Sequence, residues 1–393
     1  MRVLFVTVSG PGHYFPMVPL GWALRAAGHE VQVAAEPGFV DVITRSGLPA
    51  VAVGSDVDLF EFWGGVGVNA AAGSDPEQHR LERRTRAIRM FLRYAEAMAD
   101  DLLEYARYWR PDLVVYETRA YAGVIAAASL HVPAIRHLWG LDSTFPFREF
   151  DEPFLADLFA RYGVPEADPF GALTIEPCPK SMEVPTEVRR ERMRYVPYNG
   201  PGSVPDWLQR PAGKPRICVT WGRTFALATG HLSPARFALE AASELPVEVV
   251  AAVHAEHREL LGVLPDNVRM VEYVPLSLLL PTCDVIVHQG GAGATMTAAA
   301  YGVRQVVVPG LADQFLNAER IAATGAARRT GASPSDEDLH EAVGAVVREP
   351  SFRLAAEALQ AENQALPTPA DLVSTLADMA REHWLAHPVP GMS

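Results

Sequence analysis

A glycine-rich turn at residues 288–294, with the sequence HQGGAGA, carries the clearest chemistry in this chain. The apolar run 285–287 before it predicts a buried parallel strand, and the small residues after it predict a helix up to Tyr301. Such a turn lets bare backbone N–H groups approach a phosphate at a helix N-terminus. The residues expected to bind phosphate are His288, Gly290, Gly291, Ala292, Gly293 and Ala294.

Asp313 and Gln314 follow the next apolar run, 305–308, and supply a carboxylate and an amide. Both groups hydrogen bond well to hydroxyl-rich ligands. A phosphate site and a hydroxyl-binding pair in one half of the chain predict that a nucleotide sugar binds there. A polar loop after another predicted strand approaches the same place, and its arginine either binds a phosphate or lies on the surface. This loop consists of Gly222, Arg223 and Thr224.

His13 follows the first predicted strand of the chain, and its neighbour Gly12 is expected to approach the donor. Ligands bind at the carboxyl edge of open parallel sheets, and imidazole titrates near neutral pH, so His13 suits the role of a general base. The alternative is a loop histidine with a structural hydrogen bond. A carboxylate on its second ring nitrogen would improve the base. Glu117, at a strand end, and Asp142, at the end of a loop, are the candidates, and either could instead cap a helix.

The segment 288–326 resembles the donor-site signature of family 1 glycosyltransferases, and among these it is most similar to bacterial enzymes that glycosylate antibiotics. Two positions depart from the family pattern, because Gln289 stands in place of a second histidine and Arg304 in place of a proline. The matching positions are His288, Gly290, Gly291, Gly293, Thr295, Asp313, Gln314 and Asn317.

The resemblance implies the GT-B architecture, an α/β fold of two Rossmann-like, doubly wound domains that face each other across a cleft. The alternation of apolar strands and helices in both halves of the chain agrees with this fold. We expect an N-terminal acceptor-binding domain at residues 1–205 and a nucleotide-sugar-binding domain at 216–370. The remaining residues, 371–393, should form a helix that returns to the N-terminal domain.

The resemblance also implies roles for single residues. The Gly-His-x-x-Pro spacing around His13 is similar to the family's catalytic histidine motif, which makes His13 the expected base. Tyr273 and Val274 match a segment in which the ring stacks on the pyrimidine and the following backbone binds its edge, although Tyr273 could also be interior packing. Met296 stands where relatives that use uridine nucleotides often have a ribose-binding glutamate, so a thymidine diphosphate (dTDP) sugar is the expected donor.

Aromatic residues gather in the irregular segments of the N-terminal half. A hydrophobic polycyclic or macrocyclic acceptor would pack against such side chains. Several of them must be ordinary core residues, and we expect about half to line a pocket. The candidates are Phe60, Phe62, Trp63, Tyr121, Trp139, Phe145, Phe147 and Phe150.

Composition limits the partners and the compartment. The net charge of −13 argues against nucleic-acid binding, and no apolar run reaches the length of a membrane span. The 3 cysteines have no metal-binding spacing and predict buried thiols in a reducing compartment, so the cytoplasm is the expected location. We expect no metal and no cofactor besides the nucleotide sugar, and a homodimer is possible.

The predicted reaction is an inverting transfer of a deoxysugar from a dTDP-sugar to a hydrophobic natural-product acceptor by a single displacement. A nucleotide-sugar epimerase of the same fold is one alternative, but it would need no acceptor pocket, and the aromatic loops and the Asp313–Gln314 pair weigh against it. A non-catalytic auxiliary partner of a glycosyltransferase should have lost His13 or the phosphate turn. A dinucleotide oxidoreductase would carry Gly-x-Gly-x-x-Gly after a first strand and an acid after the second, and neither half does.

Overall fold

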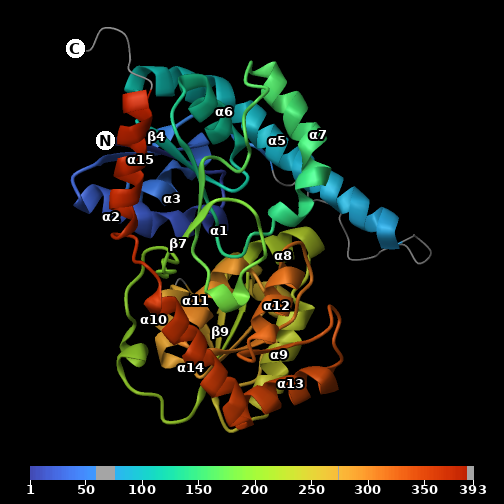
Figure 1. Ribbon diagram of the computed structural model, residues 1–393. Helices are drawn as coiled ribbons and strands as arrows, with labels where there is room; N and C mark the ends of the chain where they lie inside the picture. Colours follow the sequence, from blue (N-terminus) through green and yellow to red (C-terminus); the bar gives the residue numbers. More distant parts are fainter. Residues whose placement is uncertain (59–75, 273, 387–393) are drawn as a thin grey trace.

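The computed structural model describes residues 1–58, 76–272 and 274–386, which form two lobes, each built on one parallel sheet (Figure 1). In the N-terminal sheet seven strands lie in the order β3-β2-β1-β4-β5-β6-β7, and all neighbours pair in parallel. The strands are β1 (Arg2–Val6), β2 (Glu30–Ala35), β3 (Ala50–Ala52), β4 (Leu113–Glu117), β5 (Ala134–His137), β6 (Leu173–Glu176) and β7 (Arg190–Arg192).

Helices cover both faces of this sheet because its strands are apolar on both sides. Leu4 and Val6 of β1 pack in the core beneath the long helix α5, whereas Val3 and Phe5 pack in the core beneath α2. The helices are α1 (Pro11–Tyr14), α2 (Val18–Ala26), α3 (Val40–Thr44), α5 (Pro76–Trp109), α6 (Tyr121–Leu130) and α7 (Arg148–Arg161), with single 3₁₀ turns at η1 (Phe15–Met17), η2 (Pro37–Phe39), η3 (Phe145–Phe147) and η4 (Lys180–Met182).

The C-terminal sheet has six parallel strands in the order β10-β9-β8-β11-β12-β13. Its strands are β8 (Arg216–Trp221), β9 (Glu248–Val253), β10 (Val268–Val271), β11 (Val285–His288), β12 (Arg304–Val307) and β13 (Ala327–Arg329). Its helices are α8 (Arg223–Thr229), α9 (Ser233–Ser243), α10 (Leu276–Leu279), α11 (Ala292–Tyr301), α12 (Gln314–Ala323), α13 (Asp336–Arg348) and α14 (Pro350–Ala365), with η5 (Asp206–Gln209) in the linker, η6 (Ala255–Leu261) and η7 (Leu280–Thr282).

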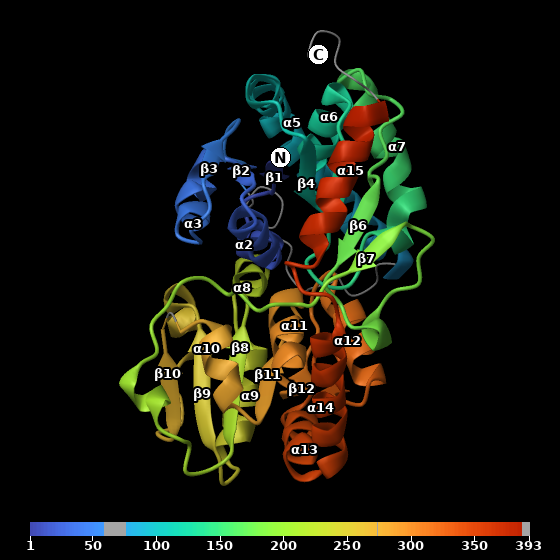
Figure 2. The ribbon, with the colours of Figure 1, turned by 60° about the vertical axis from the view of Figure 1, so that its left-hand side comes forward.

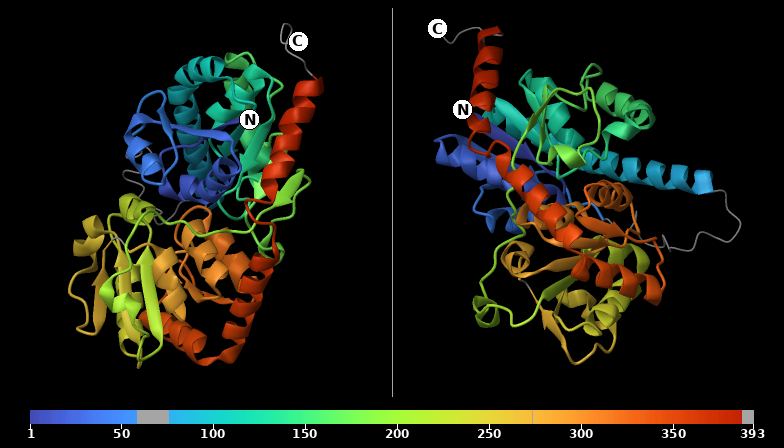
Figure 3. Two further views of the ribbon diagram at one scale, coloured as in Figure 1. Left: turned by 90° about the vertical axis from the view of Figure 1, so that its left-hand side faces the viewer. Right: turned by 60° about the horizontal axis from the view of Figure 1, so that its bottom comes forward.

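The last described helix, α15 (Leu372–Ala386), crosses from the C-terminal lobe to the N-terminal lobe (Figure 2). Leu372, Leu376 and Ala380 join the same apolar core as Phe5 of β1. The preceding helix α14 stays on the C-terminal lobe. The N-terminus and the end of α15 therefore both lie on the N-terminal lobe (Figure 3).

The two doubly wound lobes confirm the predicted α/β fold, but two local predictions are wrong. Helix α7 occupies part of a segment that the sequence pattern leaves irregular, because Pro153 interrupts the pattern and the buried apolar residues, Leu155, Leu158 and Phe159, gather in its second half. The polar turn predicted after β8 is instead the beginning of α8, which has Gly222 as its N-cap. In the described part of the chain, no helix combines the length and apolarity that crossing a membrane requires.

Leu376→Ala should lower the free energy of unfolding by about 2–5 kcal/mol, because the side chain is fully buried and its loss leaves a cavity between α15 and the sheet. The matched control is Leu385→Ala in the same helix, where the side chain is 64% exposed and we expect a change within about 0.5 kcal/mol. Urea unfolding of both variants measures the difference. Equal losses would contradict the docking of α15 on the N-terminal lobe.

Candidate active site

His13 and Glu117 meet at the carboxyl edge of the N-terminal sheet. His13 lies in α1 directly after β1, and Glu117 ends β4, the strand that pairs with β1. Nδ1 of His13 is 3.1 Å from Oε2 of Glu117, and the same oxygen accepts from the backbone N–H of Arg119. The Glu117 side chain is fully buried, whereas that of His13 is 28% exposed. The carboxylate thus orients the ring and leaves Nε2 for a ligand.

Two aromatic side chains hold the plane of the His13 ring. Trp139 contacts it edge-on, with ring centroids 4.5 Å apart, and Phe91 of α5 lies at 5.8 Å. Phe91 escapes the sequence analysis because it lies in a regular amphipathic helix. Trp139, one of the predicted acceptor residues, therefore lies against the predicted base.

Asp142 is the second candidate for the carboxylate that orients His13, but it pairs with Arg136 instead. Its carboxylate lies 2.5 Å from Nη2 of Arg136, and both side chains are buried. It also accepts from the hydroxyl of Thr144 and from the backbone N–H groups of Thr144 and Phe145. Burial favours the neutral acid, but Arg136 and these donors outweigh it and lower the pKa of Asp142. These contacts account for Asp142 as a buried partner of Arg136 that anchors the loop before η3.

The glycine-rich turn is held from within by His288. Nδ1 of His288 accepts from the backbone N–H of Gly290 at 3.0 Å, so Nε2 carries the proton and donates to Gln305 at 2.9 Å. Asn317 donates to the carbonyl of Gly290 at 2.8 Å. Gly290 itself has φ +87°, and a Cβ there would lie 2.9 Å from the carbonyl oxygen of Gln314. Glycine is therefore required at this position.

The imidazole of His288 does not face a phosphate, contrary to the expectation from the sequence. The side chain is fully buried and both ring nitrogens are engaged inside the protein. Burial lowers the pKa of His288 to about 4, so the ring is neutral at physiological pH. Its contribution to a donor site is indirect, through the shape of the turn.

The N-terminus of α11 has the open backbone that an anion site requires. Gly291 is the N-cap, and the N–H groups of Ala292, Gly293 and Ala294 form the first turn, where a helix has no intrahelical acceptors. A Cβ at Gly293 would meet no atom within 4 Å. The backbone is therefore open to an anion at the positive end of the helix dipole.

Gln289 is a site residue that the sequence analysis marks only as a departure from the family pattern. Its side chain fills the space between the N-termini of α8 and α11. A Cβ at Gly222 would lie 2.5 Å from Nε2 of Gln289, and one at Gly291 would lie 3.0 Å from it. The amide is 7% exposed, and among the described residues Oε1 has no hydrogen-bond partner. The two glycines therefore accommodate a polar amide beside the phosphate-binding backbone.

Asp313 and Gln314 lie at the start of α12, facing the N-terminal lobe. Oε1 of Gln314 accepts from the backbone N–H groups of Gly310 and Leu311 at 3.0 and 2.9 Å, which fixes the loop before the helix. Oδ2 of Asp313 accepts from Asn317 at 3.1 Å. Burial raises the pKa of Asp313, while the Asn317 hydrogen bond and the charge of His13 oppose the rise. The predicted base of one lobe thus acts electrostatically on the predicted sugar-binding carboxylate of the other.

For the other predicted donor residues, the structure gives the element on which each lies but no contact that supports a role in donor binding. Gly12 is exposed on α1, Thr224 is exposed on α8, and Val274 is partly buried in the core next to β10. Arg223 is the first residue of α8. Tyr273 and the acceptor candidates Phe60, Phe62 and Trp63 lie outside the described residues.

The remaining aromatic candidates lie around η3 and α6. Tyr121 is buried, and its hydroxyl accepts from Arg119 at 2.8 Å, so it is a core residue. Phe145 packs against Phe170, the ring of Phe147 lies under Arg84, and Phe150 contacts Phe154. Trp139 is the one described candidate that the structure places against His13.

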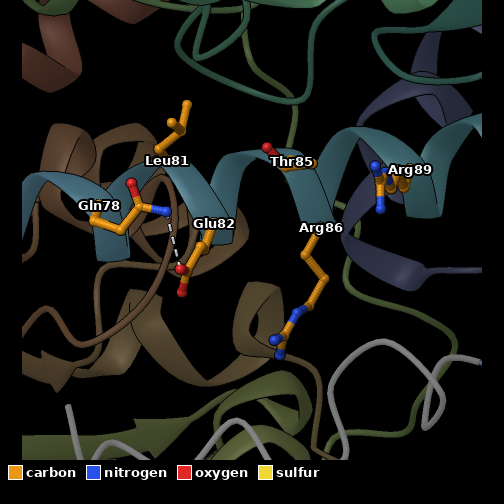
Figure 4. Close-up of a pocket in the computed structure, with 6 residues that line it drawn as sticks. All are labelled: Gln78, Leu81, Glu82, Thr85, Arg86 and Arg89. Carbon is orange, nitrogen blue, oxygen red and sulfur yellow. Dashed lines mark hydrogen bonds between the residues drawn. The ribbon is translucent and has the colours of Figure 1, made fainter. Parts of the chain in front are cut away.

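Two surface pockets lie apart from His13 and from the N-terminus of α11. One, of about 360 Å³, lies between α6 and α7 and includes Tyr121 and Arg136. The other, of about 500 Å³, lies along one face of α5 (Figure 4). All six of its lining residues come from that single helix, and Gln78 donates to Glu82 among them.

Metal ligands do not gather in the described part of the chain, where no three His, Cys, Asp or Glu side chains form a candidate metal site. The sequence does contain two Asp-x-Asp spacings, at Asp56 and Asp58 and at Asp336 and Asp338. Asp56 accepts from the backbone N–H of Gly38, and Asp338 accepts from Ser335 in the capping box of α13. The contacts of these two carboxylates are those of loop and helix capping.

Two facing Rossmann-like lobes, with a histidine–carboxylate pair on one and a glycine-rich helix N-terminus on the other, define a GT-B glycosyltransferase. Residues 22–222 match the N-terminal domain of the erythromycin biosynthesis protein CIII-like family, and residues 236–379 match its C-terminal domain. The chain belongs to this family, and its membership confirms the predicted resemblance and the glycosyltransferase class.

Known relatives agree over nearly the whole chain. The L-demethylnoviosyl transferase of Streptomyces niveus is 41% identical over 387 residues, covering 96% of this chain and 98% of the relative. A crystal structure of the glycosyltransferase VinC in complex with DTDP superimposes with a TM-score of 0.82 at 36% identity, covering 97% of this chain and 100% of VinC. The structure of the spinosyn rhamnosyltransferase SpnG superimposes with a TM-score of 0.82 at 34% identity, covering 96% of this chain and 100% of SpnG.

Gly293→Ala should weaken binding of thymidine diphosphate at least 10-fold and leave the melting temperature unchanged. The methyl group meets open space in the free protein but occupies the approach to the α11 N–H groups. Gly213→Ala, a linker glycine whose Cβ would also meet nothing within 4 Å, is the matched control. Titration calorimetry measures the affinities. Unchanged affinity in Gly293→Ala would place the diphosphate elsewhere.

Proposed function

We propose that this chain is an inverting glycosyltransferase that moves a deoxysugar from thymidine diphosphate to a hydroxyl group of an apolar natural-product acceptor. The observation that carries the proposal is the His13–Glu117 pair at the carboxyl edge of the N-terminal sheet, in which Nδ1 lies 3.1 Å from Oε2. The names of relatives support it, since one transfers L-demethylnoviose and another is a 3-alpha-mycarosylerythronolide B desosaminyl transferase. Structures of SpnG with thymidine diphosphate and with spinosyn aglycone support both ligand classes.

His13 acts as the general base in this proposal. The acceptor hydroxyl transfers its proton to Nε2 as its oxygen attacks the anomeric carbon. Nδ1–H donates to Glu117, whose charge stabilises the imidazolium that forms. Because Glu117 is buried and also accepts from the Arg119 backbone, it keeps one orientation throughout the reaction.

The C-terminal lobe stabilises the leaving group. As the anomeric C–O bond breaks, its electron pair passes to the diphosphate, and negative charge develops beside the first turn of α11. The N–H groups of that turn and the amide of Gln289 are the donors. Attack from the face opposite the diphosphate inverts the anomeric centre. These donors belong to the protein itself, so we propose the nucleotide sugar as the sole co-substrate.

Asp313 and Gln314 bind the sugar. The Asp313 carboxylate accepts from sugar hydroxyls, and the NH₂ group of Gln314 remains to donate, because its carbonyl oxygen is engaged by the loop at Gly310 and Leu311. The His13–Glu117 pair and the intact turn favour a catalytic chain over a non-catalytic auxiliary partner.

A deoxynucleotide fits the apolar position at Met296. This side chain is 1% exposed and packs toward Gly140 of the N-terminal lobe, where a Cβ would lie 3.3 Å from Met296 Cγ. A thioether binds no ribose hydroxyl, so no contact at this position depends on the 2′-hydroxyl that uridine diphosphate carries.

His13→Ala should lower kcat about 10²–10⁴-fold with an aliphatic alcohol acceptor, the usual contribution of a general base, while the affinity for thymidine diphosphate changes little. Glu117→Gln should lower kcat less, because the base remains and only its orientation and charge stabilisation weaken. His340→Ala on the surface of α13 is the control. Steady-state kinetics with near wild-type turnover in His13→Ala would remove His13 from the mechanism.

Thymidine diphosphate should bind more tightly than uridine diphosphate by about 1–2 kcal/mol, since one hydroxyl and one methyl group distinguish the two ligands. Met296→Leu, which also lacks a ribose-binding group, should keep the same preference. Titration calorimetry of both ligands on both proteins provides the values. A clear uridine preference in the wild-type protein would refute the assigned donor.

A further inference from the structure

Unpaired polar atoms line the carboxyl edge of the N-terminal sheet. Among the described residues, buried atoms without a hydrogen-bond partner include Oγ of Ser9, both carboxyl oxygens of Glu36, Oε1 of Glu117 and Nε2 of His137. These residues end or directly follow β1, β2, β4 and β5, which are adjacent in the sheet. Buried polar atoms are normally paired, so a group of unpaired ones at a single edge indicates that a bound molecule completes them.

Glu36 is the least satisfied of these residues, and strand register places it near His13. It is fully buried directly after β2, and the residues of β2 alternate between the two faces of the sheet. Ala34 packs in the same core as Tyr94 of α5, so Glu36, two residues later, lies on the face that α5 covers. Phe91, which contacts the His13 ring, is one turn earlier in that helix.

The surroundings of Glu36 contain other acids and a hydroxyl. Burial raises the pKa of Glu36 to about 7, Ser9 partly opposes this rise, and Asp56 adds to it. Burial is the main cause of the raised pKa of Tyr94, and the charges of Glu36, Glu117 and Asp56 raise it further. The free protein therefore keeps a carboxyl group in an environment that disfavours its charge, and the nearby Ser9 and backbone groups offset this only in part.

We propose that Glu36 and Ser9 form a polar subsite that binds a second hydroxyl group of the acceptor, distinct from the hydroxyl that receives the sugar. The proposal rests on the proposed function, because it takes the acceptor to lie beside His13. A hydroxyl group donates to the Glu36 carboxyl group and accepts from the Ser9 hydroxyl, so it completes both side chains at once. The pair then selects acceptors that carry two hydroxyl groups on an apolar frame.

The test measures acceptor binding rather than turnover. Dissociation constants for 1-naphthol and for the regioisomeric naphthalenediols are determined by calorimetry in the presence of thymidine diphosphate. We expect at least one diol to bind the wild-type protein 5-fold or more tightly than 1-naphthol, and Glu36→Gln and Ser9→Ala to reduce this preference to less than 2-fold. Glu30→Gln, at the exposed start of the same strand, is the matched control and should retain it.

Separate outcomes distinguish this subsite from the proposed function. Failure of thymidine diphosphate to bind would count against the glycosyltransferase proposal, whereas the diol preference decides the subsite on its own. Absence of a preferred diol, or a preference that survives in Glu36→Gln, would overturn the subsite and leave Glu36 to a buried water. The melting temperature of free Glu36→Gln should rise above that of the wild-type protein at pH 8, because an uncompensated carboxylate is removed. A lower melting temperature would instead assign Glu36 a structural role and overturn the proposal.

Discussion

The site depends on one constraint, that parallel strands deliver every following loop to the same edge of their sheet. In this chain the two edges face each other, so the loop after β1 and the turn after β11 meet at the junction of the lobes. Contacts between the lobes maintain this arrangement, since Arg320 donates to the carbonyl of Met182 at 3.0 Å and Asn199 donates to Thr297 at 3.2 Å. The return of α15 to the N-terminal core ties the lobes together a second time.

Burial and partners decide what each histidine of the site does. His13 is partly exposed and has a carboxylate on one nitrogen, which leaves the other nitrogen to accept a proton. His288 is fully buried between a backbone N–H group and an amide oxygen, and its pKa falls to about 4. The same side chain therefore has a nitrogen open to a ligand in one lobe and is a structural support in the other. Both histidines lie at the carboxyl end of a strand or in the segment after it, and this sequence pattern alone does not separate the two roles.

Much of the fold is predictable because apolar periodicity and strand ends are local properties. The strand predicted from the apolar run 285–287 agrees with β11 to within one residue, and the helix predicted up to Tyr301 is α11, which ends there. Helix α7 is not predictable in this way, because packing rather than its own period stabilises it. The choice between Glu117 and Asp142 depends on which side chain reaches His13 and which pairs with Arg136. Gln289 stands out in the sequence only as a departure from the family pattern, and Glu36 draws attention only through its missing partners, which a sequence does not reveal.

The distribution of charge within the site separates its two chemical tasks. The donor side uses backbone N–H groups, a neutral His288 and the uncharged amide of Gln289, none of which changes its charge near neutral pH. In the proposed reaction, such a site binds a diphosphate through fixed dipoles, which need no reorganisation as charge develops on the leaving group. Titratable groups lie instead where the lobes meet, at His13, Glu117 and Asp313, around the place where a proton must leave the acceptor. In the proposed reaction, proton transfer is thereby kept on one lobe and charge stabilisation on the other, with the sugar held between them.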